Sequence, residues 1–208
     1  MAGFEFKADA AVAQSAGAGG GINTGVEVVK IEGAYLSQTT NGNNVMDLEL
    51  ITPAGAKTTI YGLCLDEKWK SGKENYDYPK WQELAAVAGM KTGATVACKR
   101  KDFNGVESDA VAFTELSGIT VMMAIQVELD VYNGKEKKKR NLYRTFFQTG
   151  HSLAEKQAGS EPKQSVALAT SMKDYETKDY KAFKAGGTTA GTEESAESET
   201  PVANEDLL

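Results

Sequence analysis

Basic and aromatic side chains occur together in three short segments of the sequence. The first segment holds Lys68, Trp69, Lys70, Lys73, Tyr76 and Tyr78, the second Lys99, Arg100, Lys101 and Phe103, and the third Tyr132, Lys137, Lys139, Arg140, Tyr143 and Arg144. Cations neutralise the phosphates of a nucleic acid, and flat rings stack on unpaired bases at about 1–3 kcal/mol per base. For one segment alone, the alternative is a solvated strand end whose charges block edge pairing. Three such segments in one chain favour nucleic-acid binding.

Sequence patterns of catalysis are largely missing. The chain has one histidine, His151, and two cysteines, Cys64 and Cys98, which are too few for a disulfide framework or a zinc site. It contains no phosphate-binding glycine loop, zinc-protease motif or nucleophile elbow. We therefore expect no enzymatic activity, no cofactor and no metal site, and we interpret both cysteines as reduced thiols.

Negative charge is concentrated at the C-terminal end of the chain. The net charge is −6, and residues 185–208 hold six acids and no base, so the rest of the chain is neutral. This stretch is too poor in apolar residues to offset the entropy of ordering, which predicts a disordered acidic tail. The alternative to an interaction tail is one that serves solubility alone. Its final charged and apolar residues predict a contact to partner proteins. They are Glu205, Asp206, Leu207 and Leu208.

The flanking composition also predicts domain boundaries. Residues 1–23 include a run of Ala, Gly and Ser and predict a flexible N-terminal arm. Residues 151–184 are polar and predict a partly helical linker, with short helices at 152–157 and 163–172. The compact domain is therefore expected at 24–150. No apolar run approaches about 18 residues and no secretory signal precedes the domain, so we expect a cytoplasmic protein without a membrane segment.

The compact part of the sequence predicts mostly strands. Alternating or β-branched stretches occur at 26–36, 45–51, 57–65, 94–101, 119–132 and 135–147. Pro79 predicts the start of a helix that ends at Gly89 or Gly93. Trp81, Leu84, Ala85 and Ala88 share one face of this helix, so we interpret Trp81 as a core residue.

The turn at Asn133-Gly134 predicts the register of the longest hairpin. A two-residue loop places Tyr132 opposite Lys135, and it pairs opposite charges across the strands. The further pairs that this register predicts are Asp130–Lys137, Glu128–Lys139, Ile125–Leu142, Ala124–Tyr143 and Val121–Phe146. Tyr143 then lies on the same face as Lys137 and Lys139. A longer turn would reverse the faces.

The element order is three strands, one helix, one strand and a long hairpin. A mainly β, OB-fold-like five-stranded barrel with one helix after the third strand has this layout, and its termini are expected to be disordered. A β-sandwich is the alternative fold. A βαβ fold is excluded because a single helix interrupts the strands.

Several segments share the pattern of a known family. They are Val45-Met-Asp-Leu-Glu-Leu-Ile51, Tyr61-Gly-Leu63, the Lys/Gly/Tyr loop after it, Tyr78-Pro-Lys-Trp-Gln-Glu-Leu-Ala-Ala-Val-Ala-Gly-Met90 and Tyr143-Arg-Thr-Phe-Phe147. Together with an OB-type core and an acidic tail that ends in hydrophobic residues, they resemble the single-stranded DNA-binding proteins of tailed bacteriophages. The commonest tail of that family ends in Phe after a run of Asp, whereas this tail is rich in Glu and ends in Leu207-Leu208.

This resemblance implies a protein that coats single-stranded DNA during replication, recombination and repair, without sequence preference and without catalysis. It adds Tyr61 to the predicted DNA contacts. It also implies that the tail recruits replication or recombination proteins. We expect the protein to be a monomer or a homodimer, and to lie in the host bacterial cytoplasm if it is encoded by a phage. Two alternatives stay open: an RNA-binding or replication-accessory module on the same fold, and a structural or scaffolding phage protein.

Overall fold

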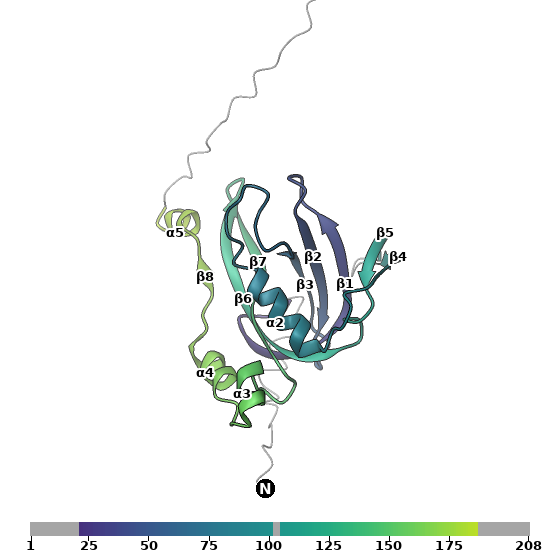
Figure 1. Cartoon of the computed structure of the whole chain (residues 1–208). Coiled ribbons are helices and arrows are strands. Elements are labelled where there is room, and N and C mark those ends of the chain that lie inside the picture. Colours follow the sequence, from purple (N-terminus) through teal and green to yellow (C-terminus); the bar gives the residue numbers. More distant parts are fainter. Residues whose placement is uncertain (1–20, 102–104, 187–208) are drawn as a thin grey trace, which may run out of the picture.

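The structure, a computed structural model, describes residues 21–101 and 105–186 (Figure 1). Within these ranges the chain forms one eight-stranded sheet and four helices. The strands are β1 (Gly25–Gln38), β2 (Asn44–Ile51), β3 (Lys57–Cys64), β4 (Thr95–Lys101), β5 (Glu107–Phe113), β6 (Thr120–Tyr132), β7 (Lys135–Phe146) and β8 (Tyr175–Glu176). The helices are α2 (Tyr78–Ala88), α3 (Leu153–Ala158), α4 (Gln164–Ser171) and α5 (Lys178–Lys184). The predicted mainly β class is confirmed.

The long strand β1 joins two parts of the sheet. Its second half pairs with β2, which pairs with β3, and its first half pairs with β6, which continues into the β6–β7 hairpin. These pairs are antiparallel, whereas β8 runs parallel to β6. The register of β1 shifts between Ile31 and Gly33, and such a bulge bends a strand. β1 can therefore curve from one part of the sheet to the other, as Figure 1 shows.

The sheet is open, so the prediction of a closed five-stranded barrel is wrong. Among the described residues, no backbone pairing joins β3 to β7, the pair that would close the barrel. The β4–β5 hairpin also adds two strands, and it pairs with β1 at Tyr35 and Leu36. The sequence did not predict β5, because its first residues, Glu-Ser-Asp, are weak strand formers. Backbone pairing with β4 along its whole length supports it instead.

The main core lies between the curved sheet and α2. Val29, Met46, Leu48 and Ile125 are fully buried there, and Leu84 from α2 packs against them. Pro79 stands in the first turn of the helix, and Gly89 ends it in a left-handed conformation at φ 72°. The predicted helix is confirmed. Trp81 packs against the core, with its ring centroid 5.7 Å from that of Phe113.

The β6–β7 hairpin follows the predicted register over most of its length. Asn133 and Gly134 both have positive φ angles, and Tyr132 lies opposite Lys135. The pairs Asp130–Lys137, Glu128–Lys139 and Ile125–Leu142 are also as predicted. The last two predicted pairs, Ala124–Tyr143 and Val121–Phe146, are wrong. A bulge between Ala124 and Ile125 leaves Tyr143 as an extra residue, so Ala124 faces Arg144 and Met122 faces Phe146.

The segment after the hairpin packs onto β6. The predicted short helices correspond to α3 and α4, while α5 was not predicted. Tyr180 of α5 is 7% exposed and forms a second apolar cluster with Val127 and Leu129. Its hydroxyl donates a hydrogen bond of 2.9 Å to Glu136. The outer half of the apolar face of β6 is therefore covered by the C-terminal segment.

The terminal predictions fall largely beyond the residues placed by the structure. The flexible arm at 1–23 and the acidic tail at 185–208, with its four proposed partner contacts, lie mostly or wholly outside the described residues. Across 21–101 and 105–186, no helix has the length and apolar character needed to cross a membrane.

Candidate functional site

The loop between β3 and α2, residues 65–77, is fixed by two buried asparagines. The Asn75 side chain donates hydrogen bonds to the carbonyl oxygens of Cys64 and Asp66, at 3.3 and 2.6 Å. The Asn43 side-chain oxygen accepts a hydrogen bond of 2.8 Å from the Lys70 backbone. The loop is therefore attached to the turn between β1 and β2, and buried polar groups hold it in one conformation.

This loop presents the first predicted segment to solvent. We call its five residues Lys68, Trp69, Lys70, Lys73 and Tyr76 the loop patch. Tyr76 is 81% exposed, the lysines are exposed and Trp69 is half-buried. None of the three lysines forms a salt bridge with another described residue. Lys70 nevertheless lies near Asp66, whose pKa is lowered first by hydrogen bonds from Asn44 and then by this charge.

Four residues of the third segment share one side of the β6–β7 hairpin, the side on which Gln126 lies. We call them the hairpin face: Tyr132, Lys137, Lys139 and Tyr143. Tyr132 is 66% exposed and Tyr143 is 46% exposed. The Lys137 ammonium lies 5.5 Å from the centre of the Tyr132 ring. This surface combines exposed rings with cations, although Lys137 and Lys139 stand opposite Asp130 and Glu128.

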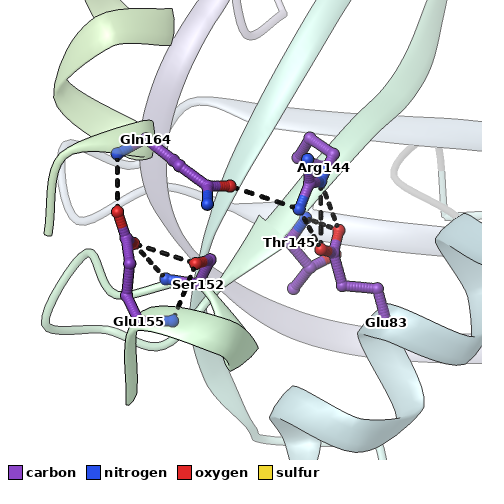
Figure 2. Close-up of polar contacts among 6 residues, drawn as sticks. All are labelled: Glu83, Arg144, Thr145, Ser152, Glu155 and Gln164. Carbon is purple, nitrogen blue, oxygen red and sulfur yellow. Dashed lines mark hydrogen bonds and ion pairs between the residues drawn. The ribbon is translucent and has the colours of Figure 1, made fainter. Parts of the chain in front are cut away.

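The two arginines of the third segment form hydrogen bonds with other residues of the protein. Arg144 donates hydrogen bonds of 2.7 to 3.0 Å to both carboxylate oxygens of Glu83 on α2, and Figure 2 shows it between Glu83 and Gln164. The Arg140 Nε donates a hydrogen bond of 2.7 Å to the Ile22 carbonyl oxygen, and burial lowers the pKa of Arg140. These contacts occupy groups that the sequence suggested for phosphate binding.

The second segment lies on the β4–β5 hairpin. Figure 1 shows this hairpin apart from the loop before α2 and from the β6–β7 hairpin. Lys99 pairs with Asp109 at 2.6 Å on its surface. Arg100 points back to β2, where it meets Glu49 at 2.8 Å and Asp47 at 3.2 Å. Lys101 is exposed, and Phe103 lies outside the described residues.

Arg100 neutralises two carboxylates on the outer side of the sheet. Burial alone would lower its pKa, but hydrogen bonds and charge from Glu49 and Asp47 raise it. Its guanidinium lies 4.6 Å from the centre of the Tyr35 ring. Gly33 leaves room for that ring, because a Cβ there would come within 2.5 Å of the ring carbons. Arg100 therefore links β4 to the outer surface of β1 and β2.

Three tyrosines stand at or beside register shifts of the sheet. Tyr35 follows the shift in β1, Tyr143 is the extra residue of β7, and Tyr61 lies beside the shift between Met46 and Leu48. The Asp47 carboxylate accepts a hydrogen bond of 3.0 Å from the backbone of Gly62, whose φ is 70°. Bulges re-aim side chains, and Tyr61 is 60% exposed.

The loop patch and the turn of the hairpin lie at the same end of the molecule. In Figure 1 the loop before α2, the β1–β2 turn and the β6–β7 turn all lie at the upper end. Tyr78, at the start of α2, is half-buried. The structure thus brings the first segment and the turn end of the third segment to one end of the molecule. Tyr143 and Arg144 lie farther along β7, and the second segment lies on the separate β4–β5 hairpin.

A buried carboxylate joins the two short helices α3 and α4 of the C-terminal segment. The Glu155 carboxylate accepts hydrogen bonds of 2.8 to 3.0 Å from the backbones of Ser152, Lys163 and Gln164. Figure 2 shows those from Ser152 and Gln164. Burial alone would raise the pKa of Glu155, but these bonds and the Ser152 hydroxyl lower it to about 2. Glu155 therefore joins α3 to the start of α4.

Acid should weaken this junction. The folded-state pKa of Glu155 lies below its usual 4.5, so its contribution to stability is complete above pH 4.5 and is lost as the pH falls toward 2. Glu155→Gln should lower the free energy of unfolding at pH 7 by about 1–3 kcal/mol, because an amide group would face backbone donors. Urea unfolding at pH 7 and pH 3 measures both effects. An equal acid-induced loss in the wild type and Glu155→Gln would contradict this role.

Tyr175, Lys173 and Lys181 were not predicted as site residues, although they line a cleft with Tyr143. Tyr175 is 54% exposed and lies on the two-residue strand β8. A strand this short gives no alternating pattern, and the mixed polar composition around it suggested a linker. Its proximity to Tyr143, across β6, is visible only in the folded chain.

No group of three or more His, Cys, Asp or Glu side chains in the described ranges could hold a metal ion. The exposed lysines and aromatic side chains of the loop patch and the hairpin face are suited to binding a polyanion whose flat bases are unpaired. No protein-family model and no curated protein sequence matches the chain.

Proposed function

We propose that this protein binds single-stranded DNA without sequence preference and protects it during replication, recombination and repair. The observation that carries the proposal is the placement of exposed lysines and aromatic rings in the loop patch, at one end of the sheet, and along the hairpin face, which begins at that end. The lysines contact phosphates and the rings stack on bases, so binding needs no particular base sequence.

The topology supports the same proposal. β1 pairs with both β2 and β6, and α2 follows the third strand. This order is that of an OB-like fold opened between β3 and β7, with the β4–β5 hairpin inserted after the helix. In such folds the β1–β2 turn and the turn of the last hairpin flank the binding surface. Here both turns lie at the end of the molecule that carries the loop patch. The resemblance to bacteriophage single-stranded DNA-binding proteins is part of this proposal.

Fluorescence titration with oligo-dT tests the function. Trp69 and the exposed tyrosines should be quenched as bases stack on them, and log K should fall linearly with log salt concentration. A parallel titration with oligo-U and with duplex DNA separates the alternatives. Tighter binding of oligo-U would favour an RNA-binding module, and the absence of salt-sensitive binding to any oligonucleotide would contradict the proposal.

The acidic tail supplies a second test. Its six acids and no bases make it a competitor for the same lysines, and its final residues are proposed to recruit replication or recombination proteins. Deleting residues 185–208 should tighten oligo-dT binding at low salt, with a smaller gain at high salt because screening weakens the competition. Unchanged or weaker binding of the truncated chain would argue against this competition.

A further inference from the structure

A cleft of about 840 Å³ lies beside the hairpin face. One side is formed by Gln126 of β6 and Tyr143 of β7, and the other by Leu168, Lys173, Tyr175 and Lys181 of the C-terminal segment. Tyr143 is the bulged residue of β7, and Tyr175 pairs with Glu128 on the opposite edge of β6. Two exposed tyrosines from distant parts of the chain therefore line one cleft.

The wall formed by the C-terminal segment is held in place by hydrogen bonds. The Gln126 side chain donates a bond of 3.1 Å to the carbonyl oxygen of Lys173. The Thr177 hydroxyl donates a bond of 2.8 Å to Asp130, on the strand that forms the opposite wall. β8 pairs with β6 just beyond the point where β1 stops pairing with it. The cleft is therefore part of the folded sheet rather than a gap beside a loose end.

The charges around this cleft leave two cations available. Glu176 pairs with Lys184 at 3.0 Å, and Asp174 accepts a hydrogen bond from the Thr24 hydroxyl. Lys173 and Lys181 form no salt bridge with another residue of the described ranges. The acids of the cleft thus have partners, while its two lysines can meet a phosphate.

We propose that this cleft binds one nucleotide of the same single strand that contacts the hairpin face. The base lies against Tyr143 and Tyr175, and its phosphates contact Lys173 and Lys181. Lys137, Lys139 and Tyr143 follow one another along one side of β7 and lead from the turn to the cleft. Along a strand, residues two positions apart are about 6.7 Å apart. The inference rests on the proposed function and extends the bound strand from the end of the sheet along the hairpin.

The test uses the full chain and an oligo-dT that carries a single 2-aminopurine. Tyr175→Ala should weaken binding about tenfold, and Tyr175→Phe should restore it, because stacking needs the ring and not the hydroxyl. The salt slope should be unchanged in both, whereas Lys173→Ala with Lys181→Ala should flatten it by about 1.4. Phe183→Ala is the matched control, since Phe183 is an exposed aromatic of α5 that does not line the cleft.

The outcomes separate this inference from the proposed function. If the wild type fails to bind oligo-dT, both proposals are overturned. If the wild type binds and Tyr175→Ala binds equally well with the same 2-aminopurine signal, this inference alone is overturned. Competition with dTMP adds one more arm: saturation of the cleft by the free nucleotide while oligo-dT stays bound would show a mononucleotide site and contradict the path proposed here.

Discussion

Arg100→Ala is expected to lower the free energy of unfolding by about 3–5 kcal/mol, because it leaves two carboxylates without their cation. The Arg100 side chain is 18% exposed and that of Glu49 is 4% exposed, so the pair is largely shielded from water. The substitution also removes the guanidinium that lies over the Tyr35 ring. Equilibrium urea unfolding, followed by tryptophan fluorescence, measures the change.

A neighbouring lysine provides the control for this prediction. Lys99 pairs with Asp109 on the same β4–β5 hairpin, but their side chains are 70% and 87% exposed. Lys99→Ala should therefore change stability by less than about 1 kcal/mol. Arg100→Lys keeps the charge but not the planar fork that reaches both carboxylates, so it should fall between the two. Equal losses for Arg100→Ala and Lys99→Ala would contradict the role assigned to Arg100.

Replacing Lys137 and Lys139 together with alanine should produce the largest loss of DNA binding. Both side chains are exposed on the hairpin face and form no salt bridge with a described residue. If each contacts one phosphate of a single strand, the slope of log K against log salt should become shallower by about 1.4. We expect affinity at low salt to fall about tenfold or more. Titration with oligo-dT at four or more salt concentrations gives both numbers.

A second pair of lysines controls for net charge. Lys91→Ala with Lys138→Ala changes the total charge by the same amount. Lys138 is paired with Glu136 at 3.3 Å, and Lys91 follows α2, at the end of the molecule opposite the loop patch. This control should keep most of the salt slope. A similar flattening in both double variants would mean that the protein responds to its overall charge rather than to a defined contact surface.

The β6–β7 hairpin shows what local sequence can predict. The Asn133-Gly134 turn adopts the positive φ angles that a two-residue loop requires. It fixed the register as far as Leu142. Beyond that point the alternation of side chains continues without any signal of the bulge at Tyr143, so the pairs that followed were wrong. A single extra residue changes which face each later side chain occupies.

The availability of a cation could not be predicted in the same way. Arg144 and Arg100 belong to segments rich in bases and aromatics, yet their partners Glu83 and Glu49 lie 61 and 51 residues away in the chain. Such pairing depends on how α2 and the β4–β5 hairpin pack, which no local pattern contains. Composition identified the segments that carry positive charge, and the fold determines which charges remain available.

The most direct measurement is photo-crosslinking of an oligo-dT that carries 5-iodo-deoxyuridine, followed by peptide mapping. The proposed path predicts crosslinks at Trp69 and Tyr76 of the loop patch, at Tyr61 of β3, and at Tyr132 and Tyr143 on the hairpin face. It also predicts that 1 M salt abolishes them. Crosslinks confined to the β4–β5 hairpin, or spread evenly over the exposed aromatics including Phe183, would contradict the claim that the loop patch and the hairpin face bind the strand.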